Sequence, residues 1–476
     1  MQTKLHIGGE WVETGATMPV VNPFTGAEIA RVSLGDERTL DAALSEACAA
    51  FAKTRDVSAH ERVELLRRIA EGIAARRAEF AAMIVAEAGK PITQAEGEVA
   101  RAVSTFTVAA DEAKRWNCDG DEVLTLDATP AGAGHTGIAR RFPIGVISAI
   151  TPFNFPLNLV AHKVAPCIAT GNTMVVKPAP KTPLTALLLA EVIANAGAPK
   201  GQINFVTCAN EHAARLVTDE RVAMVSFTGS PDVGWPLKTL AGKKRVCLEL
   251  GGNAGVIVHE DADLADAVPL IAAGAFGNAG QSCISVQRIF AHERIYDELR
   301  ARLIAHIRDK VQTGDPLDRA TVVGPMIRHD ALERAQARIA SAIAAGGRIV
   351  IGGEVHGPCL EATLLEDVPL THEACREELF APVATLHRYD DFEDALRLVN
   401  DSRFGLQAGV FTRDTDRHFR AFSVLDVGGV LINQVPTWRV ENMPYGGIKD
   451  SGFGREGIRY AMEEMTEIKT LIVRQT

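Results

Sequence analysis

Five apolar, β-branched runs follow one another in the middle of the chain: GVISAI (145–150), TMVVKP (173–178), QINFVT (202–207), AMVSFTGS (223–230) and RVCLELGG (245–252). Ala-rich amphipathic stretches separate them, and this alternation is typical of a parallel sheet covered by helices. Several of the runs end in glycine, proline or a polar residue. Because ligands of open α/β sheets bind beyond the carboxyl ends of the strands, we expect these endings to face a ligand.

Two further patterns extend this organisation. Apolar positions recur every three or four residues between 40 and 117, which predicts a helical layer that breaks at Gly89-Lys90-Pro91. A second set of strand-like runs follows residue 263 and includes VQRIFAH (286–292), GGRIVIGG (346–353), VATLHRYDD (383–391) and GGVLINQ (428–434). We therefore expect an α/β fold with more than one domain.

The composition is that of a globular protein. The 476 residues are 47% hydrophobic and 23% charged, and the formal net charge is −10. An acidic protein is repelled by nucleic acid and by anionic membranes, so we expect neither as a partner. The N-terminus MQTKLHIGGEW has no basic segment followed by an apolar core, and the eight cysteines include no C-x-x-C pair, so we expect a reduced, cytoplasmic protein without a metal site.

Cys283 is the first candidate for chemistry. It stands in FGNAGQSCISVQR (276–288), after a glycine-broken segment and before a strand-like run, where free backbone N–H groups favour a thiolate. Its small neighbours would let a substrate approach. The alternative is a buried, unreactive thiol, which is the usual fate of a cysteine outside such a context.

Two polar residues near strand ends could assist such a thiol. Glu249 ends an apolar run, and a carboxyl group with apolar neighbours has a raised pKa suited to a general base. Asn154 stands between Pro152 and Pro156, which restrict the backbone and could aim its amide at an oxyanion. The alternatives are a salt-bridged glutamate and a turn asparagine.

Two other strand ends are candidates for binding a nucleotide. Lys177 could meet ribose hydroxyls or a phosphate, and Phe227-Thr228-Gly229-Ser230 closes a strand before a helix whose first N–H groups could hold a pyrophosphate. A solvated lysine and a capped turn are the alternatives. The segment GFGREG (452–457) matches a dinucleotide loop, but no apolar strand precedes it and too little chain follows for a βαβ unit, so we set this match aside.

Taken together and in this order, a series of motifs resembles the aldehyde dehydrogenase superfamily: FNFP (153–156), KPAP (177–180), FTGS (227–230), ELGG (249–252), GQSC (280–283), EELFAPV (377–383) and PYGGIKDSGFGREG (444–457). The resemblance extends over nearly the whole chain. It implies an aldehyde dehydrogenase-like fold with a Rossmann-like NAD(P)-binding domain over residues 1–117 and 141–248 and an α/β catalytic domain over residues 249–430.

The resemblance also implies a small oligomerisation extension made of residues 118–140 and 456–476. VLTLDA (123–128) and EIKTLIV (467–473) lie in this extension and are typical of exposed strands that pair with each other or with a neighbouring subunit. Members of the family are usually dimeric or tetrameric, so we expect a homodimer or a homotetramer.

The resemblance assigns the chemistry. Cys283 matches the cysteine that attacks the aldehyde, and Asn154 with the Cys283 backbone N–H matches the donors to the thiohemiacetal oxyanion. Hydride transfer to the nicotinamide leaves a thioester, and Glu249 matches the base that activates water to hydrolyse it. Glu456, in the GREG segment, matches a residue proposed as a proton relay.

For the cofactor, the resemblance implies NAD or NADP. It places Lys177 at the adenosine ribose, Gly229 and Ser230 at the pyrophosphate, and Glu378 at the nicotinamide ribose. The full predicted set is Thr151, Phe153, Lys177, Ala179, Pro180, Phe227, Gly229, Ser230, Leu250, Glu378 and Phe380. Many NAD-preferring members carry glutamate where this chain has Pro180, which neither holds the ribose 2′-hydroxyl nor repels a 2′-phosphate. Both cofactors stay open, and we favour NAD only because it is the commoner.

The run INQVPTWRVENMPYGGIKDSGFGREG (432–457) is closest to the branch that oxidises short hydrophilic aldehydes, such as lactaldehyde, succinate semialdehyde, glyceraldehyde phosphate, and phosphonate or sulfonate aldehydes. Several of these are anions, and an anion requires a fixed donor such as arginine in the pocket. The candidates are Arg101, His162 and Arg439. A solvated or salt-bridged side chain is the alternative for each of them.

Three other functions agree with part of the sequence. In a coenzyme A-acylating relative, coenzyme A takes the acyl group from Cys283, but such members often lack the carboxylate that matches Glu249. A non-catalytic relative would be expected to have lost Cys283, Asn154 or Glu249, and all three are present. A cysteine hydrolase of the Cys-His type would leave the nucleotide motifs unexplained.

Overall fold

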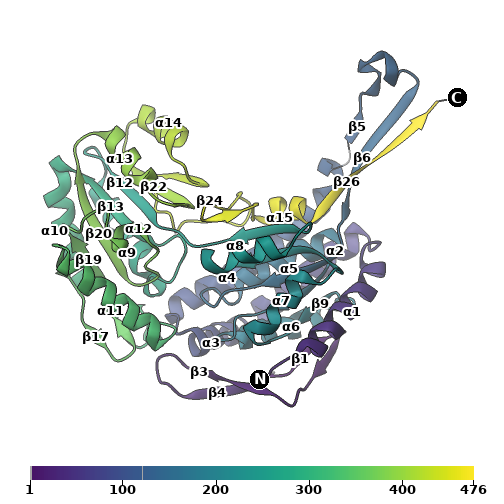
Figure 1. Ribbon diagram of the computed structural model, residues 1–476, viewed down its shortest axis with the longest axis horizontal. Coiled ribbons are helices and arrows are strands. Elements are labelled where there is room, and N and C mark those ends of the chain that lie inside the picture. Colours follow the sequence, from purple (N-terminus) through teal and green to yellow (C-terminus); the bar gives the residue numbers. More distant parts are fainter. Residues whose placement is uncertain (1–2, 121, 476) are drawn as a thin grey trace.

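The computed structural model describes residues 3–120 and 122–475, apart from the side chains of residues 117–120 (Figure 1). Two large sheets with their helices form two lobes, and a small sheet projects from one of them as an arm. The predicted α/β class is confirmed. Within the described ranges, no helix has the length and apolar character needed to cross a bilayer.

The first large sheet has eight strands in the order β2-β1-β9-β8-β7-β10-β11-β25. All five predicted runs form parallel strands in it: β7 (Val146–Ile150), β8 (Thr173–Lys177), β9 (Ile203–Phe205), β10 (Val222–Thr228) and β11 (Arg245–Glu249). Antiparallel pairs add β1 (Leu5–Ile7), β2 (Glu10–Val12) and β25 (Gly452–Phe453) at its edges.

This strand order creates a switch point between β7 and β10, because the chain leaves these two neighbours toward opposite edges of the sheet. The segment 151–154 follows β7, and Gly229-Ser230 follows β10. Both segments therefore lie at the carboxyl edge of the sheet, beside the switch point, where open α/β folds bind nucleotides.

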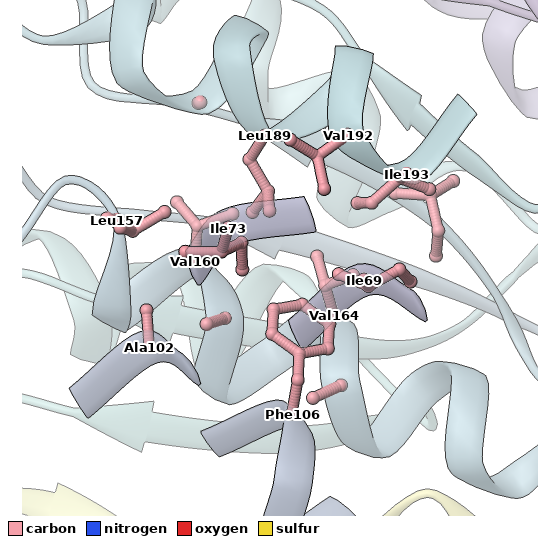
Figure 2. Packing of buried hydrophobic residues seen from close by; sticks show 14 of the residues in the cluster. Ile69, Ile73, Ala102, Phe106, Leu157, Val160, Val164, Leu189, Val192 and Ile193 are labelled. Carbon is pink, nitrogen blue, oxygen red and sulfur yellow. The ribbon is translucent and has the colours of Figure 1, made fainter. Parts of the chain in front are cut away.

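Helices from two parts of the chain build the core beside this sheet. They are α1 (Glu37–Thr54), α2 (Ala59–Ala75), α3 (Arg77–Ala88), α4 (Ile92–Gly120), α5 (Asn158–Thr170) and α6 (Pro183–Asn195), followed by α7 (Asn210–Thr218) and α8 (Pro231–Leu240). Gly89 ends α3 in a left-handed conformation with φ of +68°, so the predicted break in the helical tract is confirmed. Figure 2 shows Ile69 of α2, Phe106 of α4, Val164 of α5 and Leu189 of α6 packed in one buried cluster.

The second large sheet has seven strands in the order β16-β19-β20-β13-β12-β22-β23. Its strands are β12 (Ala254–Val258), β13 (Val286–His292), β16 (Arg348–Ile351), β19 (Thr363–Glu366), β20 (Val383–Tyr389), β22 (Gln407–Phe411) and β23 (Gly429–Ile432). Four of them, β13, β16, β20 and β23, fall in the runs that were predicted after residue 263, whereas β12, β19 and β22 were not predicted. The helices of this lobe are α9 (Leu264–Phe276), α10 (Glu293–Lys310), α11 (His329–Ala344), α12 (Glu373–Arg376), α13 (Phe392–Asn400) and α14 (Thr415–Val424).

The chain after β23 returns from the second lobe to the first (Figure 1). β24 (Ile448–Lys449) pairs with β21 (Phe404–Gly405) in the second lobe, and β25 then pairs with β11 in the first. α15 (Ile458–Glu464) follows and packs on α5. We call residues 433–465 the tether, because they join the two lobes beside the carboxyl edge of the first sheet.

The arm is a three-stranded sheet in the order β26-β6-β5, made of β5 (Glu122–Leu124), β6 (His135–Pro143) and β26 (Thr466–Arg474). The two segments predicted as exposed strands both contribute to it, although only Val123 and Leu124 of VLTLDA lie in β5, because residues 126–128 form the 3₁₀ helix η1 (Leu126–Ala128). The two segments do not pair with each other. β6 lies between them, and β26 pairs with β6 from Thr466 opposite Pro143 to Arg474 opposite His135. Four apolar side chains of β26 are about half exposed: Ile468, Leu471, Ile472 and Val473.

Three short strand pairs lie outside these sheets: β3 (Thr17–Val21) with β4 (Glu28–Ser33), β14 (Gln312–Thr313) with β15 (Thr321–Val323), and β17 (Val355–His356) with β18 (Cys359–Leu360). A second 3₁₀ helix, η2 (Pro130–Gly132), lies between β5 and β6.

Replacement of Phe106 by alanine tests the packing of the helical core. Phe106 is fully buried among α2, α4 and α5, so Phe106→Ala is expected to lower the free energy of unfolding by about 3 to 5 kcal/mol. Phe419→Ala, at a side chain that is 68% exposed, is the matched control and is expected to change it by less than about 0.5 kcal/mol. Urea unfolding followed by circular dichroism measures both. Equal losses would contradict the packing described above.

Candidate active site

A cavity of about 970 Å³ opens at the carboxyl edge of the first sheet. Its wall comes from strand ends and helices of the first lobe, from the turn after η3 (Gly277–Gly280) in the second lobe, and from the tether. The three residues predicted as catalytic, Cys283, Glu249 and Asn154, all line it. The predicted substrate residues and the predicted relay line it as well: Arg101, His162, Arg439 and Glu456.

Cys283 lies on the turn between η3 and β13 and is half-buried. Gly280 makes this turn possible, because its φ is +65° and a side chain there would meet the Ala381 carbonyl oxygen at 2.0 Å. The Cys283 Sγ lies 3.3 Å from the hydroxyl oxygen of Tyr445. Burial raises the pKa of the thiol to about 12, so a base must remove its proton before the sulfur can act as a nucleophile.

Asn154 is buried and is joined to the Cys283 turn by two hydrogen bonds. Its Nδ2 donates to the carbonyl oxygen of Gln281 at 3.0 Å, and the side chain of Asn278 donates to the Asn154 carbonyl oxygen at 3.3 Å. An amide nitrogen carries two hydrogens, so the second Nδ2 hydrogen can serve an oxygen atom in the cavity. The geometry is compatible with the predicted oxyanion donor.

Glu249 is the last residue of β11 and is 3% exposed. Neither of its carboxyl oxygens has a hydrogen-bond partner among residues 3–120 and 122–475. Burial and the charge of Glu456 raise the pKa of Glu249 well above its usual range, whereas Arg439 and Lys163 oppose that shift. A buried carboxyl group of this kind accepts a proton readily, as a general base must.

Glu456, on the tether, has the opposite surroundings. Its Oε1 accepts a hydrogen bond from Lys163 Nζ at 2.9 Å, and its Oε2 accepts from Arg439 Nη2 at 3.4 Å. Although burial opposes ionisation, Lys163, Arg439 and His162 lower the pKa of Glu456 to about 2. Glu456 therefore stays ionised at neutral pH. This charge state does not favour the predicted relay role, which would require Glu456 to take up a proton.

The predicted substrate residues Arg101 and His162 meet at Glu441, which is buried on the tether. Glu441 accepts hydrogen bonds from Arg101 Nε at 2.9 Å and from the ring of His162. These partners lower the pKa of Glu441 despite its burial. In the described part of the chain, no acceptor reaches the buried Nη2 of Arg101 or the buried Nε of Arg439. Both arginines thus line the cavity with unused donors.

Most of the predicted cofactor residues line the cavity: Phe153, Ala179, Pro180, Gly229, Ser230, Leu250, Glu378 and Phe380. Thr151, Lys177 and Phe227 do not line it and are buried. Lys177 is linked to the wall, since its Nζ donates to Asn210 Oδ1 at 3.1 Å and Asn210 faces the cavity.

Glycines allow the segments of the site to approach one another. Glu378 Oε1 accepts a hydrogen bond from the Gly252 N–H at 3.0 Å, and a side chain at Gly251 would meet Glu378 Oε2 at 2.3 Å. A side chain at Gly252 would meet the Cys283 carbonyl oxygen at 2.2 Å. Gly251 and Gly252 therefore bring Glu378 and the Cys283 turn against the strand end that carries Glu249.

Tyr445, Lys163 and Glu441 complete the site, although we did not predict a role for them from the sequence. Tyr445 stands in the PYGG motif, but no local pattern relates its hydroxyl to a cysteine 162 positions earlier. For Lys163 a signal did exist, because His162-Lys163 is the charged or titratable pair in the otherwise apolar helix NLVAHKVAPCIAT. Such a pair must find partners when the helix is buried.

Comparison with known proteins relates this site to one family. The model of the "Aldehyde dehydrogenase family" matches residues 11–471. The chain is 40% identical to 3-sulfolactaldehyde dehydrogenase from Priestia megaterium over 473 residues, which cover 99% of this chain and 98% of that protein.

Two solved structures support the same relation. Aldehyde dehydrogenase 21 from Physcomitrella patens, in complex with its reaction product succinate, is similar with a TM-score of 0.97 and 40% identity over 99% of this chain and 98% of that one. Glyceraldehyde-3-phosphate dehydrogenase GapN from Methanocaldococcus jannaschii, complexed with NADP, has a TM-score of 0.92 and 38% identity over 97% and 100% of the two chains. The chain therefore belongs to the aldehyde dehydrogenase family, the NAD(P)-dependent oxidoreductases that its motifs resemble.

Proposed function

We propose that this enzyme oxidises a short, anionic aldehyde to its carboxylate through a thioester on Cys283, with NAD or NADP as the hydride acceptor. The observation that carries the proposal is one cavity wall that combines a thiol, an unpartnered carboxyl group of raised pKa, and two arginines with unused donors. The three relatives named above support the substrate class, because sulfolactaldehyde, succinate and glyceraldehyde 3-phosphate are all anions.

The residues at the carboxyl edge of the first sheet fit a dinucleotide. α8 begins directly after Gly229-Ser230, so the positive end of a helix lies at the cavity wall, where it suits a pyrophosphate. We assign the adenosine end to Lys177 and the nicotinamide end to Glu378 and Phe380. When bound, NAD(P)⁺ accepts the hydride that leaves the substrate carbon. Pro180 carries no charge and is compatible with either cofactor.

Cys283 begins the reaction in this proposal. Its thiol proton passes to Glu249, the sulfur forms a bond to the aldehyde carbon, and the carbonyl π electrons move to the oxygen. The Asn154 amide and the Cys283 backbone N–H donate hydrogen bonds to that oxyanion. Loss of hydride from the same carbon leaves a thioester.

Glu249 completes the reaction as a base. Once the thiol proton has left it for solvent, Glu249 takes a proton from a water molecule whose oxygen attacks the thioester carbon. The C–S bond breaks, which releases the acid and returns the Cys283 thiolate. A water molecule activated in this way competes with any other acyl acceptor, so the position of Glu249 argues against acylation of coenzyme A.

The charges at the other end of the cavity support an anionic substrate. Arg101 and Arg439 line the cavity and are held there by ion pairs with two carboxylates of lowered pKa, Glu441 and Glu456. An anionic group on the substrate would accept hydrogen bonds from the Nη2 of Arg101 and the Nε of Arg439, which no acceptor of the described residues reaches.

We also propose that the first lobe is the cofactor-binding domain, the second lobe the catalytic domain, and the arm an oligomerisation element. The half-exposed apolar residues of β26 support the last assignment, because a second copy would remove them from water.

Cys283→Ala and Glu249→Gln test the proposed nucleophile and the proposed base. Cys283→Ala is expected to lower kcat by at least about 10⁴-fold, because no thioester can form. Glu249→Gln is expected to lower steady-state turnover by about 10²- to 10⁴-fold and to slow the formation of reduced cofactor in the first turnover as well, because Glu249 takes both the thiol proton and the water proton in this proposal. Rapid mixing with detection of the reduced cofactor measures both. Cys375→Ala, outside the cavity, is the control, and an active Cys283→Ala variant would refute the mechanism.

Arg439→Gln and Arg101→Gln test the anion pocket with succinate semialdehyde and butyraldehyde, which have the same number of carbons and differ in the terminal carboxylate. Each variant is expected to lower kcat/KM for succinate semialdehyde by about ten- to a hundredfold and for butyraldehyde by much less. Arg319→Gln, at an exposed arginine outside the cavity, is the control. Equal losses for the two aldehydes would mean that the arginines serve the structure and do not select the substrate.

Glu456→Gln tests the electrostatic control of the base. The charge of Glu456 raises the pKa of Glu249, so its removal should lower that pKa and increase the ionised fraction of Glu249 in acid. The acidic limb of the kcat profile is expected to move toward lower pH by about one unit. Lys163→Met removes a cation that lowers the same pKa, and should move the limb the other way. Shifts in the same direction would contradict this explanation.

A further inference from the structure

Tyr445 lies between the two functional ends of the cavity. Its hydroxyl oxygen is 3.3 Å from Cys283 Sγ, and the Arg439 guanidinium lies 3.6 Å from the centre of its ring. The side chain is 4% exposed and lines the cavity. One aromatic residue thus touches both the proposed nucleophile and the proposed anion-binding arginine.

We propose that Tyr445 is a further catalytic residue, whose hydroxyl donates a hydrogen bond to the Cys283 sulfur and stabilises the thiolate before it attacks the aldehyde. The inference rests on the proposed function, because it takes Cys283 as the nucleophile. The thiol proton still passes to Glu249, and Tyr445 keeps its own proton throughout.

The direction of the hydrogen bond follows from the chemistry of the two groups. A thiol can donate to a phenol or accept from it, but a thiolate has no hydrogen and can only accept. Burial raises the pKa of Tyr445 well above its usual range, so the phenol stays protonated and can donate. The same hydrogen bond lowers the pKa of the Cys283 thiol against the effect of burial. Hydrogen bonds to a charged partner are stronger than neutral ones, so this bond strengthens as the thiolate forms.

The backbone holds Tyr445 in place. Its N–H donates to the Glu456 carbonyl oxygen at 2.9 Å, and the Glu456 N–H donates back at 2.6 Å. The next residue, Gly446, has φ of +152°, and a side chain there would meet Glu249 Oε1 at 3.0 Å. A hydroxyl anchored in this way needs little reorganisation when the thiolate appears, which is the condition for useful electrostatic stabilisation.

Arg439 adds a second contribution through the ring. A guanidinium stacked on an aromatic face is attracted by the ring electrons and fixes the orientation of the ring. Its positive charge also favours the thiolate directly. Tyr445→Phe would keep the stacked ring and the charge of Arg439, and would remove only the hydroxyl.

Alkylation of Cys283 by iodoacetamide tests the inference on the full-length enzyme without cofactor or aldehyde. In Tyr445→Phe, the alkylation rate at neutral pH should fall by about ten- to a hundredfold, and it should stay below that of wild type at every pH of the profile, because less thiolate is present. Mass spectrometry of the modified peptide confirms that Cys283 carries the label. Tyr460→Phe, the same change at a tyrosine outside the cavity, should leave the profile unchanged.

A second readout separates a catalytic hydroxyl from a packing role. In Tyr445→Phe, the ratio of kcat/KM for succinate semialdehyde to kcat/KM for butyraldehyde should stay within about threefold of the wild-type ratio. The reason is that the Arg439 guanidinium still stacks on an aromatic ring at position 445. An unchanged alkylation profile in Tyr445→Phe would overturn the role of the hydroxyl and leave the thioester mechanism intact. An active Cys283→Ala variant would instead overturn the mechanism itself, so the two failures are distinguishable.

Discussion

The ion pair between Lys163 and Glu456 is the contact on which the arrangement of the site depends. Both side chains are at most 3% exposed, and each would be costly to bury without its partner. The pair joins α5 to the tether, and the tether also carries Tyr445 and Arg439. The apolar residues of α15 supply much of the burial, whereas the ion pair fixes the register in which the tether crosses the cavity.

This contact also divides the roles of two neighbouring carboxyl groups. Glu456 is paired with a lysine and an arginine, so its pKa falls, whereas Glu249 has no hydrogen-bond partner in the described residues and its pKa rises. Two carboxyl groups of identical chemistry therefore differ in their affinity for a proton because their surroundings differ. The negative charge of Glu456 makes Glu249 a stronger proton acceptor. Glu249 therefore suits the proposed role of base, whereas Glu456 suits a structural role as a fixed charge.

Local features of the sequence were sufficient to predict five strands of the first large sheet, four strands of the second, and residues at the carboxyl ends of the first set. They did not predict β1, β2, β12, β19, β22 or β25. β-branched runs and glycine breaks are short-range signals, and Cys283, Glu249 and Asn154 each stand beside one. Contacts between distant segments had no such signal: the Tyr445 to Cys283 contact spans 162 positions, and the Lys163 to Glu456 pair spans 293. The pairing of β26 with β6 was missed for the same reason, because two exposed strands do not reveal which neighbour separates them.

The glycines of these motifs allow backbone segments to approach closely, whereas the reactive residues act through their side chains. At Gly252 the end of β11 comes so close to the Cys283 turn that a side chain would lie 2.2 Å from a carbonyl oxygen, and at Gly428 a side chain would lie 1.7 Å from the Gly446 carbonyl oxygen. Backbone contacts of this kind cannot relax by a change of rotamer, so they hold the thiol and the base in a stiff frame. The side chains of Arg101 and Arg439 are held instead by ion pairs with Glu441 and Glu456. Ion pairs between side chains can rearrange by a change of rotamer, so the proposed anion pocket can differ while the proposed reacting groups keep the positions that the glycines give them.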